Sequence, residues 1–245
     1  MKKLTAGFIP LLDCAPIIAA VEQGFAAAEG LELKLVRETS WANIRDRLIV
    51  GHFDVAHMLG PMAVASTLGV GHLRAPMIAP FALGLGGNAI TVSLPLWEQM
   101  AGEGASIGAG PRVQGKALAR VVASRARAGH EPLTFGMVYP FSCHNYELRY
   151  WLAAVGIEPD RDVRLVVIPP PFIADAMRAD PNVRLFWTAG YYDLTTPAYG
   201  TQYSFDQVGV PSDRTTAAIL PGPHGVFADE ANRELLAARL RKWVH

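Results

Sequence analysis

The chain has 245 residues, and its 22 Lys and Arg balance 22 Asp and Glu, so the formal net charge is zero. Half of the residues (51%) are hydrophobic and 18% are charged, which excludes a disordered chain and indicates a packed globular protein. The neutral charge excludes the electrostatic signature of a non-specific nucleic-acid binder. No run of 18 apolar residues occurs, so no membrane span is expected.

Short apolar segments alternate with helical patterns along most of the chain. Strands are expected at residues 6–11, 31–37, 55–59, 89–93, 133–138, 163–168, 183–189 and 215–220, and helices at 15–28, 40–50, 61–68, 96–100, 116–128, 145–155, 173–179 and 228–244. Ser40 is placed to cap the second of these helices, and Gly30 and Gly51 to end two of them. This order predicts an α/β fold, with mostly parallel sheets and helices on both faces.

The first residues bear on the compartment. Two lysines could open a secretory signal, but Gly7, Pro10 and Asp13 interrupt the apolar stretch that follows, and a signal peptide needs an unbroken one. Cys14 and Cys143 lie in no CxxC or Cys/His ligand spacing, which favours two buried thiols in a reducing compartment and no metal site. A cytoplasmic location is therefore expected, with the periplasm as the alternative.

Four stretches carry a family resemblance. They read GFIPLLDCAPIIAAVEQGF, SWANIRDRLIVGHFDVAHMLGPMAVASTLG, PMIAPFALGLGGNAITVS and SCHNYELRYWLAAVGIEPDRDVRLVVIPPP. Through them residues 4–171 resemble the nitrate- and bicarbonate-binding proteins of ABC transporters and their cytoplasmic nitrate-sensor relatives. The resemblance implies the two-lobed, type II periplasmic-binding-protein fold. It also implies a receptor for a small oxyanion (nitrate, nitrite or bicarbonate) that is not an enzyme and needs no cofactor.

The resemblance also places candidate ligand residues. Trp41, Asn88 and His144 fall on ligand-contacting positions of the nitrate receptors. They offer an indole N–H with a flat ring, an amide, and an imidazole that can carry a positive charge, which suit a planar anion. Gly86 and Gly87 would let backbone N–H groups approach the anion closely.

Structural roles remain open for the same residues. His57 ends an expected strand and faces the expected cleft, so it is either a further ligand residue or a core histidine. Trp41 could serve packing alone, and Asn88 could merely tolerate a left-handed turn. Arg149 is expected to pair with a carboxylate and not with the ligand.

The partners follow from the same resemblance. A cytoplasmic sensor of this kind would hold an RNA-binding antiterminator protein, whereas a transport receptor would dock on an ABC transporter permease. No direct contact with nucleic acid is expected. A thiamine-precursor-type binding protein is an alternative, but the SWANIRD and SCHNYELRYWL stretches favour the anion branch.

The end of the chain carries a second resemblance. AMRADPNVRLFWTAGYYDLTTPAYGTQYSFDQVGV and AAILPGPHGVF make residues 173–245 resemble the C-terminal end of serine carboxypeptidase-like α/β-hydrolases. Asp193 and His224 then match the acid and base of a triad. The GxSxG match around Ser106 is not preceded by an expected strand, so the nucleophile is missing and no hydrolysis is expected.

Three segments result. Residues 1–92 are expected to form the first lobe, residues 93–171 an incomplete second lobe, and residues 172–245 a hydrolase-like tail. The chain is therefore interpreted as a truncated receptor fused to a hydrolase remnant, with anion affinity reduced or lost relative to a complete relative.

Overall fold

The computed structural model describes residues 1–71, 73–84, 88, 90–170, 172, 185–192, 212–222 and 229–244. The chain divides into two compact units. Unit 1 comprises Met1–Ala89, Gly136–Glu147 and Val167–Pro171, and unit 2 comprises Ile90–Phe135, Leu148–Val166 and Phe172–His245. The division into residues 1–92, 93–171 and 172–245 stays a prediction.

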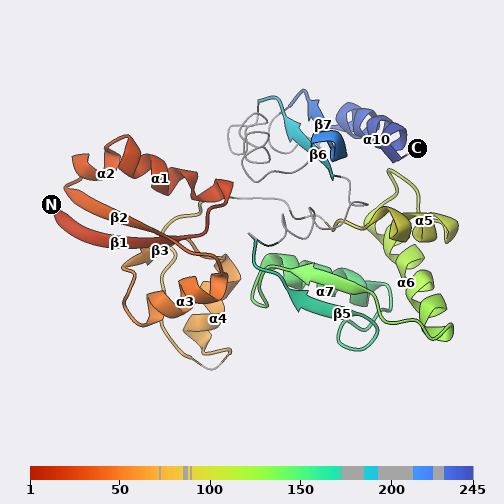
Figure 1. Ribbon diagram of the computed structural model, residues 1–245, viewed down its shortest axis with the longest axis horizontal. Coiled ribbons are helices and arrows are strands. Elements are labelled where there is room, and N and C mark those ends of the chain that lie inside the picture. Colours follow the sequence, from red (N-terminus) through yellow and green to blue (C-terminus); the bar gives the residue numbers. More distant parts are fainter. Residues whose placement is uncertain are drawn as a thin grey trace. The chain divides into compact units, whose positions relative to one another are not determined.

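Unit 1 is built on a parallel three-stranded sheet (Figure 1). Strands β1 (Lys2–Phe8), β2 (Leu31–Arg37) and β3 (Val55–Ala56) lie in the order β2-β1-β3. Both pairs are parallel, so the predicted parallel arrangement is confirmed. Strand β1 begins earlier than the expected residues 6–11, because it pairs with β2 along its whole length.

The helices of unit 1 are η1 (Leu12–Cys14), α1 (Ala15–Glu22), α2 (Phe25–Ala28), α3 (Trp41–Ile49) and α4 (Gly60–Leu68). The single helix expected at 15–28 is wrong. Gly24 adopts a left-handed conformation (φ 74°) and separates α1 from α2, because an L side chain rarely takes this backbone angle and glycine takes it readily.

The core of unit 1 forms beside the sheet. Its buried residues are Ile9, Trp41, Ile44, Phe53, Met62 and Tyr139. Gly7 of β1 lies directly against the Phe53 ring, where a Cβ atom would clash. The absence of a side chain at Gly7 is therefore a packing requirement.

The described part of unit 2 holds helices and short strands. Its first elements are α5 (Leu94–Gly102), α6 (Pro111–Arg127), β4 (Thr134–Met137), α7 (Cys143–Ala154) and β5 (Arg164–Val167). The division between the units falls within β4, α7 and β5. The strand expected at 89–93 is wrong for its described residues, 90–93. There Ser93 caps α5, and its Oγ accepts a hydrogen bond from Leu96 N at 3.4 Å.

Strands β4 and β5 pair with each other. Arg164 N donates to Leu133 O and Ile168 N to Met137 O, both at 2.8 Å, and this constant offset is that of a parallel pair. The core beside them comes mainly from α6 and α7; its buried residues include Leu118, Val121, Leu148 and Leu152.

The last described elements are β6 (Leu185–Gly190), η2 (Ser212–Arg214), β7 (Thr215–Leu220) and α10 (Glu230–Val244). Strands β6 and β7 are parallel, and α10 packs on β7 through Leu236 against Ala218 and Leu220. The helix expected at 173–179 lies outside the described residues. Among those described, no helix combines the length and hydropathy that crossing a membrane requires.

Candidate functional site

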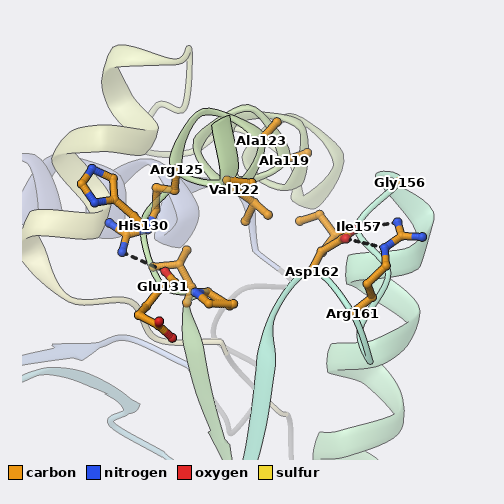
Figure 2. A pocket seen from close by; sticks show the side chains of 13 residues that line it. Ala119, Val122, Ala123, Arg125, His130, Glu131, Gly156, Ile157, Arg161 and Asp162 are labelled. Atoms are coloured by element: carbon orange, nitrogen blue, oxygen red, sulfur yellow. Dashed lines mark hydrogen bonds and ion pairs between the residues drawn. The ribbon is translucent and has the colours of Figure 1, made fainter. Parts of the chain in front are cut away.

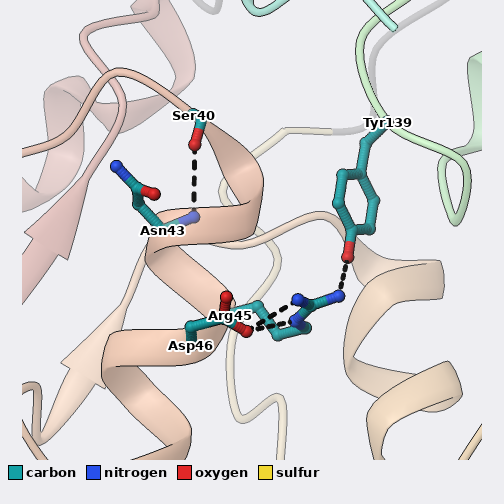
Figure 3. A network of polar contacts seen from close by, with 5 residues as sticks. All are labelled: Ser40, Asn43, Arg45, Asp46 and Tyr139. Atoms are coloured by element: carbon teal, nitrogen blue, oxygen red, sulfur yellow. Dashed lines mark hydrogen bonds and ion pairs between the residues drawn. The ribbon is translucent and has the colours of Figure 1, made fainter. Parts of the chain in front are cut away.

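Trp41 is held at the start of α3 by the cap that the sequence predicts. The Ser40 Oγ accepts a hydrogen bond from Asn43 N at 3.2 Å (Figure 3), which satisfies one free N–H of the first turn. The Trp41 side chain is 1% exposed, and its buried Nε1 has no hydrogen-bond partner among the described residues. A buried N–H without a partner costs about 1–3 kcal/mol.

His57 follows β3 and contacts Trp41. Its backbone N donates to Gly7 O at 2.9 Å, and its side chain is 2% exposed. The imidazole meets the indole edge to face, with ring centroids 5.0 Å apart and planes 76° apart. The His57 Nδ1 is also buried, and no partner is described for it. Within the described part of the chain, two adjoining rings therefore each hold one buried nitrogen without a partner.

Asp13 completes this cluster, although the sequence did not single it out as a site residue. It lies in η1, and its Oδ2 is 3.2 Å from His57 Nε2. Burial opposes its ionisation, but the hydrogen bond and charge of His57 outweigh burial and lower the pKa of Asp13. One signal could have identified Asp13 as a site residue. Asp13 and His57 each follow a strand, and the two strands, β1 and β3, are parallel neighbours. The carboxyl ends of such strands meet at one edge of the sheet, where ligands often bind.

The other predicted ligand residues lie at the surface of unit 1. His144 is exposed in the first turn of α7 and helps to lower the pKa of Asp13 through its charge. Asn88 is exposed, and its Nδ2 donates to Glu147 Oε2 at 2.8 Å. Gly86 and Gly87 lie outside the described residues. Thus Trp41 and His57 are brought into contact, His144 acts on the cluster through charge, and Asn88 is engaged by a carboxylate.

The segment that carries His144 is fixed by hydrogen bonds. The buried Ser142 Oγ donates to Tyr139 O at 2.7 Å and accepts from Asn145 N at 3.1 Å, which caps α7. Arg45 of α3 donates to the Tyr139 hydroxyl and pairs with Asp46 at 2.7 Å (Figure 3). This network ties α3, which begins at Trp41, to the segment that leads into α7.

The two cysteines differ. Cys14 is buried next to Asp13, and burial raises the pKa of its thiol, which therefore stays protonated. Cys143 is exposed at the first position of α7, so the expectation of two buried thiols is wrong for it. Within the described residues, no three His, Cys, Asp or Glu side chains gather to hold a metal ion.

A cavity of about 280 Å³ lies elsewhere, in unit 2 (Figure 2). It is lined by α6 and by the segments around His130 and Ile157, and by none of the predicted ligand residues. The Arg161 guanidinium on its rim pairs with Asp162 at 2.8 Å, and Arg125 donates to Glu131 O at 3.2 Å. Its arginines are thus engaged by acceptors of the chain itself.

Of the hydrolase-like residues, the structure describes Ser106. Ser106 follows the helix α5, and no strand lies directly before it in this described stretch. Asp193 and His224 lie outside the described residues. Arg149 pairs with Asp160 at 2.8 Å, as expected for a structural ion pair.

Comparison with known proteins assigns the fold and the family. The crystal structure of the periplasmic nitrate-binding protein NrtA from Synechocystis PCC 6803 is similar, with a TM-score of 0.60 and 28% identity over 73% of this chain and 44% of that chain. The fold is therefore that of the periplasmic binding proteins. The NMT1-like family profile matches residues 1–223, and the chain belongs to this family.

Curated relatives agree with the first resemblance, which is confirmed. The nitrate/nitrite binding protein NrtA of Nostoc sp. is 34% identical over 183 residues, which are 73% of this chain and 38% of that protein. The nitrate import ATP-binding protein NrtC of Synechocystis sp. is 38% identical over 178 residues, 72% of this chain and 24% of that protein. The bicarbonate-binding protein CmpA of Synechococcus elongatus is 28% identical over 190 residues, 73% of this chain and 39% of that protein.

The extent of these matches limits what they cover. The chain spans between 24% and 44% of the length of the relatives just named. None of these relatives is a carboxypeptidase-like hydrolase, so the hydrolase resemblance of residues 173–245 stays a prediction, as does the interpretation of the chain as a truncated fusion.

Proposed function

We propose that the chain binds a small planar oxyanion of the nitrate or hydrogencarbonate class at the carboxyl edge of β1 and β3. The observation that carries this proposal is the pair of buried, unpartnered ring nitrogens of Trp41 and His57. Native proteins pair nearly all of their buried polar atoms, so two exceptions in contact indicate a place for a ligand. Relatives whose names specify nitrate, nitrite or bicarbonate support this ligand class.

The chemistry of the cluster suits such an anion. The Trp41 Nε1 donates a hydrogen bond and its ring offers a flat face, while His57 and His144 can each carry a positive charge. Asn88, Gly86 and Gly87 remain proposed ligand contacts. Because Asn88 is bonded to Glu147, its contribution requires that bond to break.

Calorimetric titration with nitrate, nitrite and hydrogencarbonate tests the proposal. Chloride, a spherical anion of the same charge, is the control. We expect saturable binding of at least one planar anion by the wild-type chain and its loss in His57→Phe, which removes the buried nitrogens. His130→Phe is the matched control, because His130 is exposed in unit 2. Equal binding by the wild type and by His57→Phe would refute the site.

The partners and location are proposed from the same relatives. The names of NrtC and CmpC specify transport ATP-binding proteins, so we propose that the chain acts with ABC transporter components and not as an enzyme. An antiterminator partner is left as a prediction. The periplasmic NrtA relative favours the periplasmic alternative, and the expected cytoplasmic location gains no support. Co-purification with the permease subunits, compared with an antiterminator protein, tests the partner.

A further inference from the structure

Asp13 fixes the hydrogen on one of the two nitrogens of His57. A carboxylate can only accept hydrogen bonds, so the 3.2 Å contact between Asp13 Oδ2 and His57 Nε2 requires a hydrogen on Nε2. The state of Nδ1 then depends on the charge of the ring. In a neutral imidazole Nδ1 is a bare acceptor, and in an imidazolium it is a donor.

We infer that Asp13 is a positioning residue that makes the site distinguish anions by whether they carry a hydrogen atom; this inference rests on the proposed function. With neutral His57, the site presents one donor, Trp41 Nε1, and one acceptor, His57 Nδ1. Hydrogencarbonate matches this pair, because it has an O–H group as well as accepting oxygens. Nitrate has only acceptors and would face a bare lone pair, so it needs the imidazolium form.

The two nitrogens can serve one ligand. They belong to rings in edge-to-face contact, with centroids 5.0 Å apart, and we expect one anion to meet both nitrogens. Both residues are buried, with exposed fractions of 1% for Trp41 and 2% for His57. Water competes little with the ligand there, and a mismatch between donor and acceptor is costly.

Among the charged groups near the cluster, Asp13 is the one that determines which nitrogen of His57 carries the hydrogen. The lowered pKa of Asp13 keeps its carboxyl ionised at neutral pH. Besides His57, His144 on α7 is the titratable group described as acting on Asp13. Asp13 in turn adds to the rise that burial causes in the pKa of the neighbouring Cys14 thiol.

Other acids and bases packed around the cluster have partners of their own. Glu38 binds Arg47 and Asn43, Asp54 accepts from the Thr5 backbone, and Arg45 is held by Asp46 and Tyr139. None of these contacts involves His57.

Two measurements on the intact chain test the inference. The ¹⁵N shifts of the His57 ring in the anion-free chain report which nitrogen carries the hydrogen, and we expect Nε2–H with bare Nδ1 in the neutral ring. Calorimetry in buffers of different ionisation enthalpy counts the protons taken up on binding. We expect net proton uptake with nitrate and none with hydrogencarbonate, and a nitrate affinity that falls as the pH rises.

Asp13→Asn separates this role from a merely structural one. An amide can donate or accept, so the variant lets the neutral ring carry its hydrogen on Nδ1. We expect nitrate binding by the variant to lose its proton uptake and its pH dependence, so that nitrate affinity at alkaline pH exceeds that of the wild type. Asp160→Asn is the matched control, because Asp160 is an ion-paired carboxylate in unit 2, and it should behave as the wild type.

The outcomes are distinct. A neutral ring with its hydrogen on Nδ1, nitrate binding without proton uptake, or an Asp13→Asn variant with the wild-type pH profile would each overturn the inference while leaving the proposed function intact. If neither anion binds the wild-type chain, the proposed function fails, and the inference fails with it.

Discussion

Trp41→Phe tests whether the unpartnered indole nitrogen is retained for a ligand at the expense of stability. The substitution keeps an aromatic ring but removes the buried Nε1, which has no partner among the described residues. Removing an unpartnered buried N–H should return about 1–3 kcal/mol of stability. The smaller ring loses packing at a site that is 1% exposed, and this should cost about 1–2 kcal/mol.

The two effects oppose each other, so we expect the free energy of unfolding to change by between about −1 and about +2 kcal/mol. Urea unfolding followed by far-UV circular dichroism measures this change without relying on tryptophan fluorescence. Calorimetric titration of the same sample measures anion binding, and we expect it to be lost or strongly weakened, because the donor is gone.

Trp151→Phe is the matched control. The Trp151 Nε1 donates to Pro111 O at 2.8 Å, so the same substitution there removes a made hydrogen bond as well as packing. We expect a loss of about 1–3 kcal/mol with anion binding unchanged. The reasoning is refuted if Trp41→Phe destabilises the chain more than Trp151→Phe does, or if Trp41→Phe binds anions as the wild type does.

Three further outcomes follow from unit 1. Gly7→Ala should cost about 1–3 kcal/mol of unfolding free energy, because the new Cβ clashes with Phe53, and Phe53→Leu should relieve part of that loss in a double-mutant cycle. Ser40→Ala should lower the free energy of unfolding by about 1 kcal/mol, because the Asn43 N–H loses its hydrogen bond to the Ser40 Oγ. Urea unfolding measures the effects of Gly7→Ala and of Ser40→Ala. The pKa of Asp13 in the folded chain lies below its ordinary value of 3.8. The ionised Asp13 therefore stabilises the fold above pH 3.8, and this stabilisation is lost as the pH falls through the folded pKa. Acid unfolding should accordingly show a smaller loss of stability in Asp13→Asn than in the wild type.

Local patterns predicted the framework of the site well. The cap at Ser40 predicted where α3 begins and hence the position of Trp41. The pattern around Val55 and Ala56 predicted that His57 lies at the end of a strand. These features depend on backbone hydrogen bonds between near neighbours in sequence. The strand expected at 89–93 failed because Ser93 is a helix cap.

Contacts between distant residues could not be read from those patterns. The bond from Asn88 to Glu147 joins residues 59 positions apart, and nothing in either local pattern indicates it. Asp13 was noticed only because it interrupts an apolar stretch, whereas its partnership with His57 depends on β1 and β3 being sheet neighbours. Topology, not composition, brings this carboxylate to the imidazole.

The net charge of the chain is zero, so the proposed anion site depends on the local charge of this cluster. Asp13 contributes one negative charge, and His57 and His144 contribute either none or one positive charge each. The cluster therefore passes from negative, with both rings neutral, to positive, with both protonated. A carboxylate beside an anion site would repel its ligand if it acted alone, but Asp13 is in contact with the imidazole, its Oδ2 lying 3.2 Å from His57 Nε2. In the proposed site a protonated His57 would supply the positive charge that nitrate requires, so we expect local protonation, and not the overall charge, to govern anion binding.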